Sequence, residues 1–457
     1  MAYILFSPVG TTDPISQNRD GGLLHICRHY RPKAVHLFYT AEMAAYREKD
    51  NRYVCSLEML EEEIGHHMEI TEETDAQLFE VQRFDNFYEI FGKHLCALEK
   101  KYPEDEILLN VSSGTPAMKS ALQTLAALSQ GKYIPIQVST PIKKSNPKVE
   151  SLKDYCVDDE WILNSDNEAE APNRTEVSST LNLQGEIRKE ILKKHLEVYD
   201  YHAALTVAKE IRNISPDVLR LLKIAVSRMQ LDQSKVTQLE KDTEFDVIPI
   251  KSSDEQSIFE YMLWLQIKAE RKEYADFVRG ITPVFLDLCE LYLKRVCNIN
   301  LNDYCESRSL HLKITDGTGK THKIKNTIFY MSRSKLSETN TGKNLLQELD
   351  QEFAGSGYRD SDFSSKQAVV WIQLLSKDEA IVKDFKILRD VESTVRNLAA
   401  HEIKSITDEW IESRSGYNTT TIMKKLKNIT TKTIKQAGNH WSSYNKMNQQ
   451  IEELLKS

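Results

Sequence analysis

EILLNVSSGTPAMKSAL, residues 106–122, joins a predicted strand to a predicted helix. EILLNV is a short apolar run of the kind found in strands that are buried on both faces. Thr115 is placed to cap the helix that follows, and Pro116 occupies its first position, where an N–H group is not needed. PAMKSALQTLAALS, residues 116–129, continues with apolar residues at helical spacing. A buried strand that runs into a capped helix is typical of a parallel sheet.

Further strands and helices extend this pattern through the first part of the chain. The other predicted strands are AYILF (2–6), AVHLFY (34–39), QLFEVQ (77–82) and YIPIQV (133–138), and a second predicted helix is FYEIFGKHLCALEKKY (87–102). Strands that are apolar on both faces and alternate with helices predict a doubly wound parallel sheet flanked by helices. The expected fold of this part is therefore Rossmann-like α/β.

A polar stretch divides the chain. SDNEAEAPNRTEVSST, residues 165–180, lacks apolar periodicity and is rich in acidic and small polar residues, which predicts a linker. The sequence after it is predicted to be all-α, apart from a polar, glycine-containing insertion at roughly 300–365. The predicted boundaries are 1–164 for the sheet domain, 165–182 for the linker, 183–272 for a helical connector and 273–457 for the last helical domain.

Composition excludes several classes of protein. The 457 residues are 40% hydrophobic and 28% charged, which is enough for two or three buried cores. The first residues enter a predicted strand without a secretory leader, and no apolar run is long enough to span a membrane. Seven cysteines are scattered without a Cys-x-x-Cys pair, which argues against disulfides and a zinc site. These features favour a cytoplasmic protein with no membrane segment and no bound metal.

Two strand ends carry residues suited to ligand binding, because ligands of open parallel sheets bind beyond the carboxyl ends of the strands. SPVGTTDPIS (7–16) follows the first strand, and NVSSGTPAMKSAL (110–122) follows the fourth. Both contain small and hydroxyl residues, and the second leads into a helix N-terminus, which favours an anion. The candidate ligand-binding residues here are Pro8, Val9, Gly10, Thr11, Thr12, Asn110, Ser112, Ser113, Gly114, Thr115, Pro116 and Lys119.

Three more candidates follow other strands. Thr40 ends the second strand, and Asp85 and Asn86 follow the third, where short polar groups can read the edge of a base. Each also fits the role of a helix cap, and both loops also fit ordinary strand-to-helix turns. Neither loop contains a Gly-x-Gly-x-x-Gly or Gly-Lys-Ser/Thr pattern, which disfavours dinucleotides and nucleoside triphosphates.

The two loops resemble those of a known sensor domain. SPVGTTDP after a short first strand, with NVSSGTPAMK after a later one, is similar to the CARF domain of CRISPR-associated proteins. The resemblance implies a Rossmann-like domain that binds a cyclic oligoadenylate at the axis of a homodimer. Groups such as Thr115 and Asn110 would then position the ring's own 2'-hydroxyl for slow cleavage of the ring.

A second motif lies in TVRNLAAHEI, residues 394–403, within the helical part. Arg396-Asn397-x-x-x-His401 resembles the HEPN ribonuclease motif, which also lies on a late helix of an all-helical domain. With the CARF-like loops before it, the whole chain resembles the ancillary ribonucleases of type III-A CRISPR systems, the Csm-six family.

Spacing alone does not establish this motif. The same separation of arginine and histidine occurs at Arg31 and His36, just before a predicted strand. Glu392 stands four residues before Arg396, so an ordinary surface ion pair also accounts for the arginine. The order of the two motifs along the chain favours the ribonuclease.

The resemblance implies metal-independent cleavage of single-stranded RNA into a 2',3'-cyclic phosphate and a 5'-hydroxyl. His401 titrates in the range needed for proton transfer, Arg396 suits the phosphate oxygens, and Asn397 would orient the phosphate or the histidine. Positions five apart on a regular helix point about 140° apart. Arg396 and His401 therefore share a site only if the helix is irregular or a second copy completes the site, as the resemblance implies.

The C-terminal part is locally basic although the net charge is -8. From Gly416 to Ile451 there are six lysines and no acid, interleaved with aromatic residues such as Trp441, which predicts a groove for single-stranded RNA or an ordinary solvated face. The complete prediction is a homodimeric endoribonuclease activated by a cyclic oligoadenylate, with cyclic hexa-adenylate favoured over the tetra-adenylate by the resemblance. The alternatives are a non-catalytic, ligand-sensing nucleic-acid-binding regulator and a nucleotide-dependent small-molecule enzyme.

Overall fold

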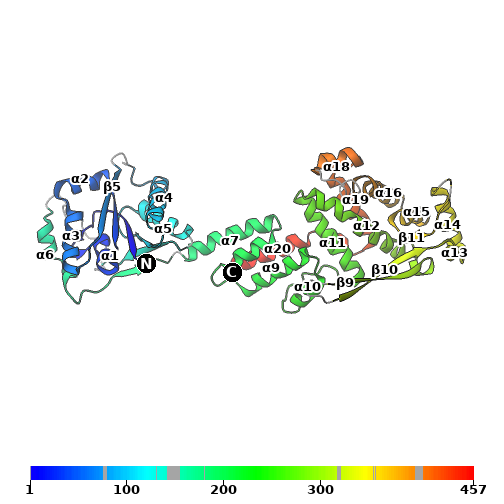
Figure 1. Cartoon of the computed structure of the whole chain (residues 1–457), viewed down its shortest axis with the longest axis horizontal. Coiled ribbons are helices and arrows are strands. Elements are labelled where there is room, and N and C mark those ends of the chain that lie inside the picture. Colours follow the sequence, from blue (N-terminus) through cyan, green and yellow to red (C-terminus); the bar gives the residue numbers. More distant parts are fainter. Residues whose placement is uncertain are drawn as a thin grey trace. The chain divides into compact units, whose positions relative to one another are not determined.

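The computed structural model describes residues 2–75, 80–129, 131–140, 155–179, 181–315, 321–353, 355, 357–396 and 405–456. At 181, 253, 309–315, 321–327 and 396 this description covers the backbone alone. Contacts between residues divide the chain into two compact units, Met1–Arg188 and Lys189–Ser457. The first unit holds a sheet flanked by helices, and the second is mostly helical (Figure 1).

The first unit is built on a six-stranded sheet in the order β5-β4-β1-β6-β7-β8. Its strands are β1 (Tyr3–Pro8), β4 (Ala34–Thr40), β5 (Glu69–Asp75), β6 (Glu106–Asn110), β7 (Tyr133–Val138) and β8 (Thr175–Val177). All neighbours are parallel except β8, which pairs antiparallel with β7. A short ribbon of β2 (Ile15–Ser16) and β3 (Arg19–Asp20) follows β1.

Helices cover both faces of this sheet. Its helices are α1 (Gly22–Tyr30), α2 (Ala41–Asp50), α3 (Arg52–Ile64), α4 (Phe84–Lys101), α5 (Pro116–Leu128) and α6 (Val157–Ile162). Ile4 and Phe6 of β1 join the hydrophobic cluster under α4 and α5, whereas Leu5 joins the cluster under α1 and α3. Because successive residues of a strand point to opposite faces, β1 is buried on both. The predicted doubly wound α/β fold is confirmed.

The third strand lies earlier than predicted. The sequence predicts it at 77–82, but β5 spans Glu69–Asp75; residues 76–79 are outside the described residues, and 80–82 form no strand. β5 is an edge strand that pairs only with β4, and its sequence EITEETD is largely exposed. An edge strand buries little apolar surface, so a search for apolar runs passes over it.

The predicted linker, 165–182, carries structure of the first unit. It contains a short 3-10 turn, η2 (Ser165–Asn167), and strand β8 at the edge of the sheet. Asp166 is buried, and its carboxylate accepts hydrogen bonds from Arg19 at 2.9 Å, Arg174 at 2.7 Å and the backbone N–H of Asp20 at 2.8 Å. The acidic composition predicts a linker here, but in the structure one of these acids, Asp166, pairs with Arg19 and Arg174.

The second unit is a helical assembly around one hydrophobic core, which extends from Leu192 to Leu455. Its helices are α7 (Leu181–Glu197, which begins in the first unit), α8 (Tyr201–Lys209), α9 (Pro216–Met229), α10 (Gln233–Glu240), α11 (Ser253–Glu270), α12 (Tyr274–Arg295), α13 (Arg333–Leu336), α14 (Asn340–Glu352), α15 (Ser365–Leu375), α16 (Glu379–Val391), α18 (Asp408–Ser415), α19 (Thr419–Thr433) and α20 (Ser443–Lys456). The prediction of a mostly helical second part is confirmed.

The C-terminal helix packs beside helices that follow the linker. Arg228 of α9 is fully buried, donates to both carboxylate oxygens of Glu260 on α11, and lies 4.2 Å from the ring centre of Tyr444 on α20. Tyr201 of α8 donates to Asn448 of α20 at 2.9 Å. The predicted boundary at 272/273 therefore falls inside one shared core.

The predicted insertion at 300–365 contains most of the β-structure of the second unit. β9 (Glu306–Thr315) and β10 (Thr321–Met331) form a long antiparallel hairpin, and β11 (Ser361–Asp362) pairs with the end of β10. Short 3-10 turns, η3 (Leu301–Asp303) and η5 (Ala437–Asn439), complete the described elements together with a π-helical turn, η4 (Glu392–Arg396).

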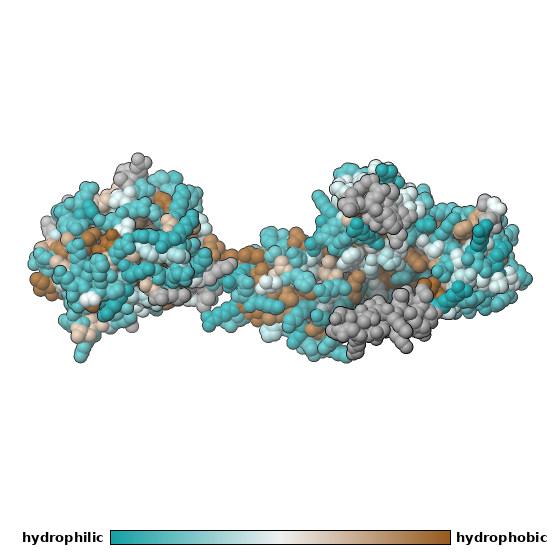
Figure 2. Space-filling model, in the orientation of Figure 1, coloured by the Kyte–Doolittle hydropathy of each residue, from teal (hydrophilic) through white to brown (hydrophobic). Residues whose placement is uncertain are grey.

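The visible face in Figure 2 is mainly hydrophilic, with hydrophobic surface gathered over α7. The exposed apolar residues of that helix are Leu183, Ile191 and Val198 at its end, which lie on one side because they recur every seven or eight residues. None of the helices that the structure describes is both long and apolar enough to cross a bilayer.

Candidate functional site

The loops after β1 and β6 lie against each other. A Cβ atom added to Gly10 would stand 2.7 Å from the backbone nitrogen of Gly114, so the two backbones are in direct contact. Gly114 has a φ of 84°, a conformation that glycine adopts without strain. The structure therefore brings together the two predicted ligand loops, 8–12 and 112–116.

Asn110 holds the second loop in shape. Its side chain is fully buried and donates to Ser7 Oγ at 2.9 Å and to Ser113 Oγ at 2.8 Å. Its oxygen accepts from the backbone N–H groups of Ser112 and Ser113. Ser112 Oγ in turn accepts from Val138 N at 2.6 Å, at the end of β7. Asn110 and the two serines thus organise the loop, and their polar groups are engaged within the protein.

Asp13 organises the first loop and is absent from the candidates chosen from the sequence. It is 1% exposed, and its carboxylate accepts from the backbone N–H of Gly10 at 2.9 Å and of Leu23, in the first turn of α1, at 3.0 Å. Ser113 also donates to it, which links the two loops. Burial raises the pKa of this carboxyl, and the three hydrogen bonds oppose that rise. The signal in the sequence is an aspartate three residues after the glycine.

The N-terminus of α5 lies at the end of the second loop. Thr115 caps the helix, since its Oγ1 accepts from Met118 N at 3.4 Å, and its hydroxyl donates to the carbonyl of Val81 at 2.8 Å. Pro116 stands at the first helical position, as predicted. Lys119 is half-buried in the same turn, and burial lowers its pKa, an effect that Asp13 opposes. A helix N-terminus with an adjacent lysine attracts an anion.

The remaining loop candidates differ in accessibility. Thr11 and Thr12 are exposed at the tip of the first loop, whereas Pro8 and Val9 are buried beneath it. Thr40 is buried at the end of β4 and precedes α2 without capping it through its side chain. Asp85 and Asn86 lie in the first turn of α4. Among the described residues, no hydrogen bond joins these last three to the two loops.

A buried cluster of possible metal ligands lies elsewhere in the first unit. One ligand atom each of Asp20, His25 and Asp166 lie within 4.8 Å of one another. Asp20 is bound by both the Nε and a terminal nitrogen of Arg28, and Asp166 by Arg19 and Arg174. Burial raises the pKa of Asp20, but hydrogen bonds from His25, Arg28 and Asn164 and the charge of Arg28 outweigh it and lower that pKa to about 2. The arginines occupy the positions that a cation would need, so the cluster fits an ion-pair network.

The nuclease motif falls at the edge of the described residues. Asn397 and His401 lie outside them, and Arg396 is described by its backbone alone, as the last residue of the π-helical turn η4. A π-helical turn has i→i+5 hydrogen bonding, so the 100° per residue of a regular helix does not hold on entry to the motif. Turns of this kind are frequent at functional sites.

Glu392 is a buried residue in this turn. Its exposure is 7%, and its Oε2 accepts from Ser365 Oγ of α15 at 2.6 Å and from Arg389 of α16 at 3.0 Å. This carboxylate anchors the turn between two helices. The side chain of Arg396 lies outside the described residues, so its ion pair with Glu392 stays an alternative prediction.

The lysine-rich segment is partly neutralised by Asp384 of α16 and by Asp378, the residue that caps α16. Lys425 pairs with Asp384, and Lys432 with Asp378, each at 2.9 Å. Lys427 lies 5.0 Å from the ring centre of Trp441, whose indole N–H donates to Thr431. These contacts use several of the groups predicted to line an RNA groove, which therefore has less free positive charge than the sequence implies.

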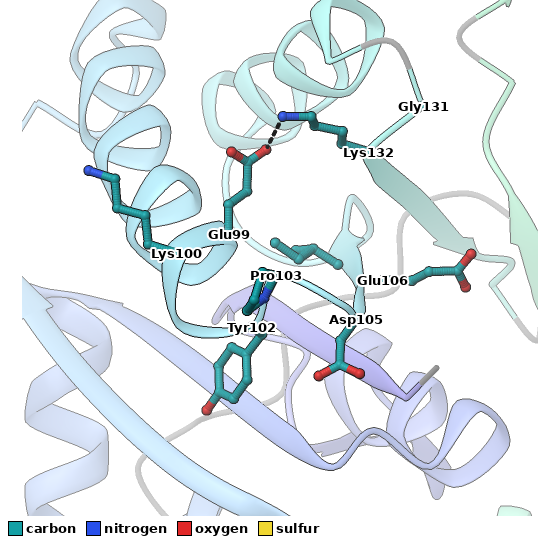
Figure 3. A pocket seen from close by; sticks show the side chains of 9 residues that line it. Glu99, Lys100, Tyr102, Pro103, Asp105, Glu106, Gly131 and Lys132 are labelled. Carbon is teal, nitrogen blue, oxygen red and sulfur yellow. Dashed lines mark ion pairs between the residues drawn. The ribbon is translucent and has the colours of Figure 1, made fainter.

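A hollow at the amino ends of the strands, opposite to the end that carries the two loops, is separate from those loops. It has a volume of about 430 Å³ and lies at the start of β6 and β7, where Glu106 and Lys132 are found (Figure 3). Glu99 and Lys132 form an ion pair across it at 3.6 Å, and Tyr102 and Asp105 also line it. Its position at the amino ends of the strands excludes it from the loop site.

Family models match successive parts of the chain. The Csm6 CARF domain matches residues 68–175, the 6H domain of CRISPR-associated protein Csm6 matches 178–229, and the Csm6 HEPN domain matches 247–452. The second candidate loop, 110–122, falls within the first match, and the 394–403 motif within the last.

Individual proteins are similar over the full length. The CRISPR system endoribonuclease Csm6 of Mycobacterium tuberculosis is 32% identical over 98% of this chain and 97% of its own. The Csm6 endoribonuclease of Enterococcus italicus is 25% identical over 99% of this chain and 100% of its own. A solved structure, Enterococcus italicus Csm6 bound to cyclic hexa-2'-fluoro-hexa-dAMP, matches with a TM-score of 0.67 at 22% identity, covering 99% of this chain and 100% of that one. The likeness to that structure shows a shared fold.

Proposed function

The chain belongs to the Csm6 family of CRISPR endoribonucleases, and we propose that it cleaves single-stranded RNA when a cyclic oligoadenylate binds its first unit. The observation that carries this proposal is the family relationship over nearly the whole length, combined with the contact of the two predicted ligand loops beside the N-terminus of α5. The first unit is the CARF sensor and the second contains the HEPN nuclease.

The activator site is formed by the loops after β1 and β6. Exposed Thr11 and Thr12, the backbone around Gly114, the α5 N-terminus and Lys119 offer hydrogen-bond donors and positive charge to the phosphates of the ring. Cyclic hexa-adenylate is the preferred ring. This preference is supported by the cyclic ligand of six nucleotides that is bound to the Enterococcus italicus protein. Thr40, Asp85 and Asn86 would contact the bases.

RNA cleavage is carried by Arg396, Asn397 and His401, without a metal. The 2'-hydroxyl attacks the adjacent phosphorus, and the RNA is left with a 2',3'-cyclic phosphate and a 5'-hydroxyl. His401 moves the proton near neutral pH, Arg396 stabilises charge on the phosphate oxygens, and Asn397 orients the phosphate or the histidine. A homodimer brings two such motifs into one composite site.

The sensor also removes its own activator slowly. The side chains of both residues proposed to orient a 2'-hydroxyl of the ring are hydrogen-bonded within the protein, Asn110 to Ser7 and Ser113 and Thr115 to Val81 and Met118, so either would exchange one of these bonds for the ring. Ring binding activates the nuclease only if the active arrangement binds the ring more tightly than the inactive one.

The test is RNA cleavage by the purified full-length chain, with and without cyclic tetra- and hexa-adenylate, in the presence of EDTA. We expect cleavage that depends on the hexa-adenylate and survives EDTA. His401→Ala should lower the rate by about 10² or more, the usual contribution of an acid–base group. The control is His440→Ala, a partly exposed histidine of the same unit. Ring-dependent RNA binding without cleavage would instead support a non-catalytic regulator.

A further inference from the structure

The helix that leads into the nuclease motif changes its winding just before Arg396. α16 is a regular helix over Glu379–Val391, and the π-helical turn η4 continues it over Glu392–Arg396. Each N–H group of a π-helical turn bonds to the carbonyl five residues earlier, so the turn holds more residues than a turn of regular helix. The place of this turn along the chain therefore decides on which face of the helix the backbone of Arg396 lies.

The side chains of the turn support its irregular winding. The carbonyl of Asp390 accepts a hydrogen bond from Ser393 Oγ at 3.0 Å and another from Thr394 Oγ1 at 2.7 Å. Hydroxyl groups that bond back to a carbonyl one turn earlier bend helices. Val395 is fully buried in the core of the second unit, whereas the two hydroxyl residues are exposed. The turn is thus fixed on its inner side and bonded back to α16 on its outer side.

A buried carboxylate ties the turn to the neighbouring helix α15. Glu392 is 7% exposed, and its Oε2 accepts from Ser365 Oγ at 2.6 Å and from a terminal nitrogen of Arg389 at 3.0 Å. Ser365 is equally buried and is the first residue of α15, where the N-terminus of the helix favours a negative charge. A buried charge is costly unless it is paired and hydrogen-bonded, so the position of Glu392 follows that of these partners.

The start of α15 is a firm anchor for this hydrogen bond. The side-chain oxygen of Gln367, which is 5% exposed, accepts from the backbone N–H of Ser364 at 3.1 Å and closes the first turn of the helix. Trp371, further along α15, is fully buried, and the helix packs against α12 and α16. The turn η4 itself packs against α12 and α18. The hydrogen bond from Ser365 therefore joins the turn to a well-packed part of the unit.

We propose that Glu392 is a positioning residue of the nuclease, which holds the π-helical turn through Ser365 and Arg389 and so sets the direction from which Arg396 meets the RNA phosphate. This rests on the proposed ribonuclease function. A carboxylate repels a phosphate, and this one is buried, so Glu392 acts on the RNA only through the turn. Without its anchor the turn is free to rewind towards a regular helix, which would move Arg396 to another face.

The experiment separates the rate of the chemical step from substrate binding. Ser365→Ala removes the hydrogen bond to Glu392 without adding bulk. Initial rates of RNA cleavage by the full-length chain are measured over a range of RNA concentrations with saturating cyclic hexa-adenylate. A misplacement of about 1 Å can lower a rate by about 10², so we expect kcat to fall between about tenfold and 10²-fold with KM unchanged. Ser365→Thr, which keeps the hydroxyl, should restore most of kcat.

The matched control lies at the other end of the same helix. Ser376 follows α15, and its Oγ is hydrogen-bonded to the hydroxyl of Tyr292 at 2.8 Å. Ser376→Ala therefore also removes a serine hydrogen bond from this helix, and urea unfolding compares the stability of the two variants. We expect Ser376→Ala to keep kcat. Equal kcat values in the two alanine variants, or a higher KM with kcat unchanged, would overturn the proposal.

A second variant tests the other partner of the carboxylate. The side chain of Arg389 is 29% exposed, so Arg389→Gln is tolerated more readily by the fold than a change at Ser365. It should lower kcat in the same direction at unchanged KM, and full kcat in this variant would contradict the role of Arg389. Failure of the ribonuclease proposal itself would appear differently, as absent cleavage by the unmodified chain.

Discussion

Gly10 of the first ligand loop lies directly against Gly114 of the second. A methyl group there would meet backbone, the nitrogen of Gly114 at 2.7 Å, and backbone cannot move aside as a flexible side chain does. We predict that Gly10→Ala separates the loops and weakens binding of cyclic hexa-adenylate at least about tenfold, equivalent to about 1.4 kcal/mol. Isothermal titration of the full-length chain measures this.

The chain offers a matched control for Gly10→Ala. Gly92 lies in α4, where an added Cβ would have its nearest neighbour at 3.8 Å, an ordinary contact. Gly92→Ala should leave ring binding unchanged and stabilise the helix by up to about 1 kcal/mol. Equal ring affinities in the two variants would refute the close packing of the loops as the basis of the site.

The individual site residues were predictable to different degrees. The cap Thr115 and Pro116 follow from local chemistry, and both are found at the start of α5 as predicted. Asn110 is predicted to face a ligand, but its amide donates to Ser7 and Ser113. Ser7 lies 103 residues earlier in the chain, so this hydrogen bond leaves no local pattern in the sequence. Contacts between distant segments leave no periodic signal, and the same reason accounts for the omission of Asp13.

Among the helices, α12 carries an unusual pair of carboxyl groups. Glu290 lies one turn after Asp287, and burial together with the charge of Asp287 raises the pKa of Glu290 to about 7. A carboxyl whose pKa is higher in the folded than in the unfolded chain stabilises the fold when protonated. That contribution is complete below the ordinary value of 4.5 and is lost as the pH rises through about 7.

We predict that Glu290→Gln changes the pH dependence of stability. The amide stays neutral, so the variant should resist urea better than the unmodified chain at pH 8 and equally well at pH 4.5. Urea unfolding of the second unit, followed by tryptophan fluorescence, measures the difference. Glu412→Gln, at an exposed position of α18, should show no such pH dependence. A uniform shift at both pH values would contradict the assignment.

Elements were predictable where burial is strong. β1, β4, β6 and β7 were found from their apolar runs, since each is flanked by strands on both sides. β5 and β8 are the two edge strands, and both escaped prediction because they bury few side chains. The hairpin of β9 and β10 is predicted only as a polar insertion. Basic and aliphatic residues alternate along both strands, so neither contains a continuous apolar run.

For the whole molecule, ring binding should raise the stability of the first unit. A ligand at 100 times its dissociation constant stabilises the state that binds it by about 2.7 kcal/mol. Calorimetry of the full-length chain with saturating cyclic hexa-adenylate should therefore move the unfolding of the first unit to higher temperature. His401→Ala should leave that shift intact, because the residue belongs to the second unit. A shift absent from the unmodified chain would contradict the location of the site.

The buried Asp166 network has a consequence for protein engineering. Asp166 and the strand β8 lie beyond the segment where composition suggests that the first unit ends, and they balance Arg19 and complete the sheet. A biosensor made by transplanting this unit onto another output protein must retain the sequence through Val177. A fusion joint placed at 164 would remove the Asp166 carboxylate and leave Arg19, whose side chain is 32% exposed, without its partner, so the transplanted module would lose an ion pair and the edge strand together.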